Sequence, residues 1–241
     1  MGPTTVEIVF AIDTSESMRP CIEGLSKNLD KLILPFQGYN FKVRYGLFGY
    51  AVGKSDTGGY IYPTVTLNGD MFSIYQNPDG LFTENAKEFS QKIKQLNLAG
   101  DEDHLFALDC AFDFPFGPVN NTRRVVCLFS DERIEDGTIR KENVEAVVEK
   151  LMEKATARRI LLFMALPESP LLNLLGQIRY SQIQKVNGGD GLASLNFSSL
   201  LESMGKSISV ASIQGQEREY EKAIYGQTTW GRGTGNYDGM R

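Results

Sequence analysis

The chain has 241 residues, of which 41% are hydrophobic and 23% charged, and its formal net charge is −5. This length suffices for one α/β domain with a full core, and the composition is that of an ordinary globular protein. The mild acidity excludes a broad basic surface for nucleic acid or anionic membrane, and it is too small for a disordered acidic protein.

Short apolar runs alternate with longer amphipathic segments from the start of the chain. The strands expected in the first half are 6–12, 41–52 and 60–67, and the expected helices are 22–36, 84–96 and 104–112. The third of these strands would form an antiparallel hairpin with the second across a glycine-rich stretch. Pro63 lies within it and would confine it to a sheet edge, because proline cannot donate to a strand ladder.

The second half repeats the alternation more clearly. Its expected strands are 124–130 and 160–166, and its expected helices are 142–157, 171–186 and 195–208. Unbroken apolar strands that alternate with helices indicate a parallel sheet covered on both faces. We therefore predict an α/β, doubly wound, Rossmann-like domain. Its mostly parallel sheet would have about six strands, one of them an antiparallel edge strand, with flanking helices.

The end of the chain differs in composition from the rest. We place one domain at residues 1–213 and a glycine- and aromatic-rich tail at 214–241. Glycines in its last part argue against a helix or strand there. The tail is either flexible or a docking or modification segment around Tyr225, Thr228, Thr229 and Trp230.

Cysteine usage and the start of the chain bear on the compartment. The three cysteines, Cys21, Cys110 and Cys127, are too few and too scattered for a disulfide framework. The first residues lack a basic region, and the apolar run after them is too short for a signal peptide. No stretch reaches the roughly 18 apolar residues that span a bilayer. We therefore expect a reducing, cytoplasmic location.

A D-x-S-x-S pattern follows the first expected strand, formed by Asp13, Ser15 and Ser17. Ligands of open parallel sheets bind at the carboxyl ends of the strands, and Asp131 follows another strand to the same edge. Asp13 supplies negative charge, and the serine hydroxyls supply neutral oxygens that a tight turn can aim at one point. Such an all-oxygen set suits one hard cation, Mg²⁺, Mn²⁺ or Ca²⁺, rather than zinc.

A simpler role for the pattern is capping of the following helix by Asp13 or Ser15. Its place between a strand and a helix favours the cation site, and here the chain resembles the von Willebrand factor type A (VWA) family. The metal-ion-dependent adhesion site of that family has D-x-S-x-S after the first strand and an aspartate after the fourth, which Asp131 matches. The resemblance covers about residues 4 to 210, apart from a glycine-rich insertion between about 53 and 80.

The family's remaining ligand is a threonine in a glycine-containing loop before a later helix. In this chain Gly100 is followed by Asp101, so the resemblance implies Asp101 as the ligand from this loop. The lesser candidates are Glu102, Asp103 and His104. A simpler interpretation is a solvated acidic helix N-terminus favoured by the helix dipole. A third aspartate would raise metal affinity and weaken the attraction of the ion for a partner carboxylate.

The resemblance implies a protein-interaction module that holds one divalent ion and, through it, binds an Asp or Glu of a partner protein. Among the family, the chain is similar to stand-alone intracellular bacterial proteins of tellurium resistance and stress response. That likeness implies an ATPase, kinase or phosphatase as the partner. Neither nucleic acid nor membrane is an expected partner.

Catalysis is not expected. His104 is the sole histidine, and the sequence has no nucleophile elbow, no phosphate-binding loop and no paired cysteines. The enzymatic alternative is Mg²⁺-dependent phosphoryl transfer on Asp13, for which Ser15 stands where such enzymes place a second aspartate. The third alternative is a structural scaffold whose metal site is vestigial.

Overall fold

The computed structural model describes residues 4–36, 41–51, 53–54, 60–61, 64–66, 69–70, 81–96, 98, 103–136, 144–178, 181–186 and 195–225, with backbone only at 53–70 and 213–225. The strands are β1 (Thr4–Asp13), β2 (Phe41–Tyr50), β3 (Gly53–Lys54), β4 (Tyr60–Ile61), β5 (Thr64–Thr66), β6 (Gly69–Asp70), β7 (Phe82–Thr83), β8 (Thr122–Phe129), β9 (Ile160–Pro167) and β10 (Ser181–Val186). The α-helices are α1 (Arg19–Ile33), α2 (Ala86–Lys94), α3 (His104–Phe112), α4 (Val144–Ala157), α5 (Pro170–Leu175) and α6 (Phe197–Tyr225).

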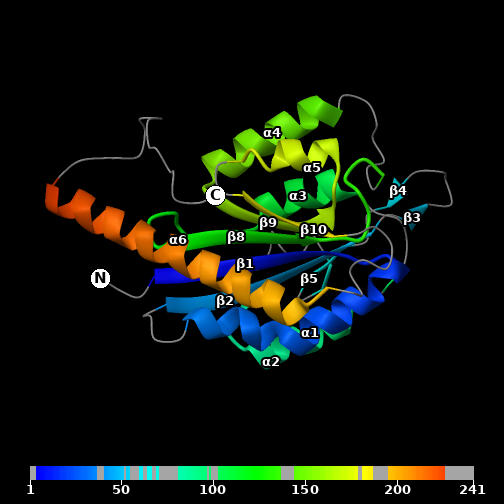
Figure 1. Ribbon diagram of the computed structural model, residues 1–241, viewed down its shortest axis with the longest axis horizontal. Coiled ribbons are helices and arrows are strands. Elements are labelled where there is room, and N and C mark those ends of the chain that lie inside the picture. The colour runs from blue at the N-terminus through cyan, green and yellow to red at the C-terminus, as the bar shows by residue number, and fades with distance from the viewer. Residues whose placement is uncertain are drawn as a thin grey trace.

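One sheet of eight strands runs through the molecule in the order β10-β9-β8-β1-β2-β5-β6, with β7 also paired to β2 (Figure 1). The strands from β10 to β2 are parallel, whereas β5, β6 and β7 are short and antiparallel. The expected α/β class with an antiparallel edge is therefore confirmed. Five of these strands, β1, β2, β5, β8 and β9, overlap the ranges that we expected as strands, whereas β10 does not, and β6 and β7 are short additions.

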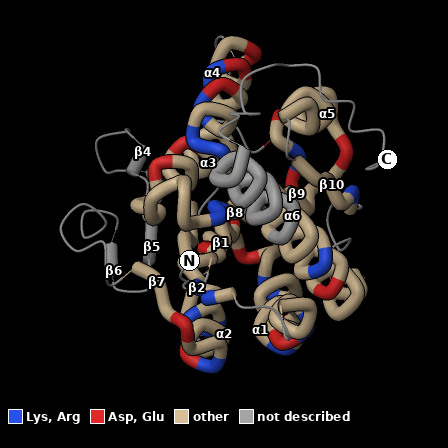
Figure 2. The backbone as a smooth tube through the Cα atoms, turned by 90° about the vertical axis from the view of Figure 1, so that its left-hand side faces the viewer, with Lys and Arg blue, Asp and Glu red and all other residues tan. Residues whose placement is uncertain are grey.

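Three helices cover each face of this sheet, so its central strands are buried on both sides. Ile8 and Phe10 of β1 pack on the side of α1, α2 and α6. Val9 and Ala11 point the other way, toward α3, α4 and α5. Figure 2 shows this arrangement with the amino ends of the strands facing the viewer and the sheet between the two helix layers. The burial of both faces explains why β1 is apolar without interruption from Ile8 to Ile12.

The register of β1 brings together residues that lie far apart in the sequence. Asp13, its last residue, is paired with Tyr50, the last residue of β2. On the other side, Ile12 is paired with Phe129, the last residue of β8. The residue after Phe129 therefore lies next to Asp13. The carboxyl ends of β1, β2 and β8 thus form one edge, where side chains from three strands can meet.

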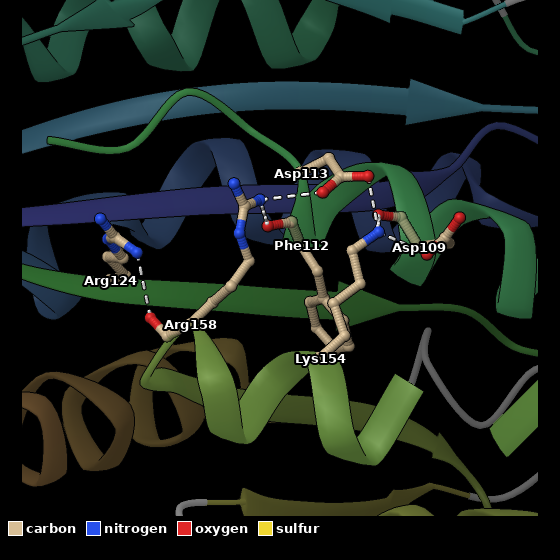
Figure 3. A network of polar contacts seen from close by, with 6 residues as sticks. All are labelled: Asp109, Phe112, Asp113, Arg124, Lys154 and Arg158. Atoms are coloured by element: carbon tan, nitrogen blue, oxygen red, sulfur yellow. Dashed lines mark hydrogen bonds and ion pairs between the residues drawn. The ribbon is translucent and has the colours of Figure 1, made fainter. Parts of the chain in front are cut away.

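Ion pairs between α3 and α4 hold α3 in place on the sheet. Lys154 of α4 contacts Asp109 of α3 and lies 2.6 Å from Asp113 just beyond it. Arg158 also contacts Asp113, at 3.0 Å, and its carbonyl accepts a hydrogen bond from Arg124 of β8 (Figure 3). These contacts join the end of α3 to the end of α4, and the first turn of α3 lies at the carboxyl edge of the sheet.

The structure corrects two of the expected helices. The helix expected at 171–186 is wrong: α5 ends at Leu175, Gly176 follows as its C-cap, and 181–186 form strand β10. The edge of β9 provides backbone partners for that segment, and this pairing overrides its helix-forming glutamines and lysine. The helix expected at 195–208 is longer than expected, because α6 runs to Tyr225.

The expected boundary at residues 213/214 therefore lies inside a helix, and the C-terminal turns of α6 extend past the amino ends of the strands (Figure 1). Pro63, Thr228, Thr229 and Trp230 lie outside the described residues. Among the helices described, none combines the length and hydrophobicity that a bilayer crossing requires.

Candidate metal centre

Asp13 ends β1 and is fully buried. Its Oδ1 accepts a hydrogen bond from the backbone N–H of Ser15 at 2.7 Å, which closes the turn that leads toward α1. Its Oδ2 accepts one from the hydroxyl of Ser130, also at 2.7 Å. Both carboxylate oxygens are therefore held, and the orientation of the carboxylate is fixed.

The other motif residues lie in contact with one another. The hydroxyl oxygens of Ser15 and Ser17 are 3.0 Å apart, and the Ser17 hydroxyl donates to Asp131 Oδ1 at 3.1 Å. Ser15 and Asp131 are buried, whereas Ser17 is exposed. The structure thus brings Asp13, Ser15, Ser17 and Asp131 into one cluster of oxygen atoms, open to solvent on the Ser17 side.

Electrostatics make this cluster an unfavourable place for a lone negative charge. Burial raises the pKa of Asp13 to about 6, and the nearby charge of Asp131 adds to that rise. The hydrogen bonds from Ser15 and Ser130 act in the opposite direction and only partly offset it. Within the part of the chain that the structure describes, neither aspartate forms an ion pair with lysine or arginine.

The donor set fits a hard divalent cation. Two carboxylates and two hydroxyls present only oxygen, the ligand type of Mg²⁺, Mn²⁺ and Ca²⁺. The described residues include no group of three His, Cys, Asp or Glu side chains placed for metal binding. A site here therefore depends on the serine hydroxyls in addition to Asp13 and Asp131.

A buried thiol lies behind the cluster. Cys21 of α1 is fully buried, and burial raises its pKa well above the usual range. The charges of Asp13 and Asp131 raise the pKa further. Cys21 therefore stays a neutral thiol, and metal binding by sulfur requires the thiolate. The ligand chemistry of the cluster remains that of oxygen.

The loop before α3 is described only in part. Asp101, the ligand implied by the family resemblance, and Glu102 lie outside the described residues. Asp103 is buried and caps α3, where its Oδ1 accepts from the N–H of Phe106 at 3.1 Å. This contact makes Asp103 part of the helix start, as the simpler interpretation expected, but its side chain is buried rather than solvated.

His104 is fully buried, and both of its ring nitrogens lie near a hydroxyl. Its Nδ1 is 2.8 Å from the hydroxyl oxygen of Tyr50, and its Nε2 is 3.4 Å from that of Ser130. Burial lowers the pKa of His104 to about 3, so the ring is neutral at pH 7.

Sequence reasoning missed Ser130 and Tyr50 as members of this site. Ser130 precedes Asp131 directly, so its place after a buried strand was a usable signal. Tyr50 lies 54 positions from His104, and no pattern in one sequence connects the two. Only the pairing of β1 with β2, which places Tyr50 beside Asp13, reveals the connection.

No protein-family model matches this sequence, and no curated protein sequence matches it. Solved protein structures, in contrast, do match the fold of this chain. Proximal thread matrix protein 1 from the mussel byssus superposes with a TM-score of 0.55 at 13% identity, over 86% of this chain and 47% of that one. The VWA domain of SpRpn10 superposes with a TM-score of 0.53 at 12% identity, over 85% of this chain and 97% of that domain. This chain thus spans about half the length of the mussel protein and nearly all of the SpRpn10 domain, and its fold is VWA-like.

Proposed function

We propose that this chain is a protein-interaction module that binds one divalent cation through Asp13, Ser15, Ser17 and Asp131. The observation that carries the proposal is the contact of these four side chains at the carboxyl edge of the sheet. In open α/β sheets this edge is the usual place for a ligand. The VWA-like fold agrees with such a role.

The chain's own residues prepare the site for a cation. Ser130 and the N–H of Ser15 orient the Asp13 carboxylate, and Ser17 holds Asp131 on the solvent side. A bound divalent ion would supply the positive charge that these carboxylates lack, and it would attract an Asp or Glu of the partner. The exposed side of Ser17 is where we place that partner residue.

Binding is preferred to catalysis for a structural reason. The residue two positions after Asp13 is Ser15, which cannot act as a general acid. The neighbouring His104 is buried with both ring nitrogens beside hydroxyls. We therefore propose that the module is not an enzyme and that Asp13 is a ligand rather than a nucleophile.

The cellular setting is proposed from the cysteines. Cys21, Cys110 and Cys127 are free thiols, which supports a reducing compartment such as the cytoplasm. The partner class is proposed from the resemblance to stand-alone intracellular bacterial VWA proteins of tellurium resistance and stress response. It is an ATPase, kinase or phosphatase with an exposed acidic residue.

Calorimetry of metal binding tests the proposal. MgCl₂, MnCl₂ and CaCl₂ are titrated into metal-stripped protein and into Asp13→Ala and Asp131→Ala. Asp113→Ala, which removes a half-exposed aspartate of the α3–α4 network, is the matched control. We expect saturable one-site binding by the wild type and the control, and none by the two site variants. Equal binding by all four proteins, or none by the wild type, would overturn the metal site.

A carboxylate probe tests the interaction itself. Acetate is titrated into ¹⁵N-labelled protein with Mg²⁺ and, separately, with EDTA. We expect shifts of the amide signals near Asp13 and Asp131 only when Mg²⁺ is present. Shifts that do not depend on Mg²⁺ would contradict binding of a partner carboxylate through the ion.

A further inference from the structure

A chain of hydrogen bonds leads from Asp13 into the interior of the protein. Ser130 donates to Asp13 Oδ2 at 2.7 Å, the Ser130 oxygen lies 3.4 Å from His104 Nε2, and His104 Nδ1 lies 2.8 Å from the Tyr50 hydroxyl. All four side chains are buried. They come from the ends of β1 and β2, the residue after β8, and the first residue of α3.

The positions of the protons along these hydrogen bonds follow from the number of donors and acceptors on each side chain. The Ser130 hydroxyl has one proton and two lone pairs. Its proton goes to Asp13, which as a carboxylate only accepts, and one lone pair accepts the N–H of Glu132 at 3.1 Å. The second lone pair is left for His104, so Nε2 is the donor. A neutral ring then has an unprotonated Nδ1, which accepts from the Tyr50 hydroxyl.

We propose that His104 is a positioning residue for Asp13, acting through Ser130. In its Nε2–H tautomer, His104 holds the Ser130 hydroxyl so that its proton points at Asp13 Oδ2, and Tyr50 selects that tautomer. The inference rests on the proposed function in that Asp13 is taken as a metal ligand. The hydrogen-bond chain itself stands without the metal.

The alternative is that His104 only fills space between α3 and the sheet. A space-filling ring has no required tautomer, and its replacement would change stability without changing metal affinity. Positioning of a ligand has a different signature, because losing the partners that orient a ligand weakens metal binding about 10- to 100-fold.

The first test is direct, because His104 is the only histidine. Protein labelled with ¹⁵N-histidine and stripped of metal is examined at pH 7.5 by long-range ¹H–¹⁵N correlation. We expect a neutral ring with the proton on Nε2, and in Tyr50→Phe a population of the Nδ1–H form. Tyr45→Phe, whose ring lies on the opposite face of β2, is the control. An Nδ1–H ring or a mixture in the wild type would overturn the proposal.

The second test measures affinity for Mn²⁺ by calorimetry. We expect Ser130→Ala and His104→Leu to weaken binding at least about tenfold. His104→Gln should stay close to the wild type, because its amide N–H can donate to Ser130. Ser212→Ala removes another buried serine hydroxyl, one that bonds within α6, and should change affinity less than twofold.

Unchanged affinity in a folded Ser130→Ala variant would overturn the positioning role, even if His104→Leu did not fold. Failure of the wild type to bind any metal would refute the proposed function instead. The tautomer measurement would then still decide whether the hydrogen-bond chain exists.

Discussion

Strand β1 carries two carboxylates that are almost completely buried, Glu7 and Asp13, and the two have different polar surroundings. Glu7 lies 2.8 Å from the guanidinium of Arg44 on β2 and also accepts the N–H of Gly117 at 2.7 Å. Asp13 accepts an N–H and a hydroxyl but has no ion pair among the described residues. Within the described part of the chain, folding thus brings a counter-charge to Glu7 but none to Asp13.

The difference supports the proposal that Glu7 is structural and that Asp13 binds a ligand. Burying a charge without a counter-charge is costly, and the pKa of Asp13, raised to about 6, expresses that cost. A carboxylate perturbed in this way at a ligand-binding edge is a candidate functional group. We therefore interpret Glu7 as a structural residue and Asp13 as a carboxylate whose buried charge a bound cation would stabilise.

The largest effect is expected when the ion pair between Glu7 and Arg44 is broken. Arg44→Met should lower the free energy of unfolding by about 3 kcal/mol, because it removes the ion-pair partner of the buried Glu7 and leaves the N–H of Gly117 as its remaining contact named above. Urea unfolding at pH 7.5 measures it. The loss should be the same with Mg²⁺ and with EDTA. Lys42→Met removes an exposed pair with Glu84 and should cost less than about 1 kcal/mol. Equal losses in both variants would contradict the structural role of Glu7.

The next effect concerns Asp13, and here the substitution should raise the free energy of unfolding rather than lower it. In EDTA at pH 7.5, Asp13→Asn should be more stable than the wild type by about 2 kcal/mol. The folded-state pKa of Asp13 is raised from 3.8 to about 6. The wild type therefore carries the cost of the buried charge above pH 6 and loses it as the pH falls to 3.8. Urea unfolding from pH 7.5 to 4.5 should show the advantage of the variant shrinking. A constant difference would contradict this account.

A third prediction concerns His104, whose pH dependence runs the other way. Its pKa is lowered from 6.5 to about 3 by burial. Its neutral form therefore contributes stability above pH 6.5 that is lost as the pH falls toward 3. Between pH 6.5 and 5.5, the wild type should lose about 1 kcal/mol relative to His104→Gln. Chemical unfolding of both proteins across this range measures it, and parallel curves would mean that His104 is not buried as a neutral ring.

The smallest effect lies in the network between α3 and α4. Lys154→Met should cost about 0.5 to 1 kcal/mol, because the two aspartates that it contacts are half exposed and the network is screened by solvent. The loss should shrink at high salt. Lys150→Met, on the same helix, is the exposed control, and thermal unfolding at 0.05 and 1 M NaCl compares them. A salt-independent loss would indicate packing rather than charge.

The parts of the structure that could be predicted are those set by local pattern. The buried strands β1, β8 and β9 each contain an unbroken apolar run of at least five residues, and Asp13 directly follows the run in β1. Strand β10 could not be predicted, because an edge strand rich in glutamine has no apolar pattern and depends on β9 for its pairing.

Some residues of the candidate site could likewise be predicted from the sequence, and others could not. The D-x-S-x-S pattern and Asp131 were visible as oxygen donors at the ends of strands. The roles of Tyr50 and His104 were not, because they depend on the register between β1 and β2 and on the placement of α3. Buried hydrogen bonds between distant segments leave no pattern in a single sequence.

The most direct test of the central claim is the stability of the wild type and of Asp13→Asn as Mg²⁺ is added to metal-free protein. A ligand that binds only the folded state at 100 times its Kd stabilises it by about 2.7 kcal/mol. We predict that the wild type, less stable than the variant in EDTA, gains stability with rising Mg²⁺ and overtakes it, while Asp13→Asn does not respond. The same response in both proteins, or none in the wild type, would contradict the claim that Asp13 is held for a cation.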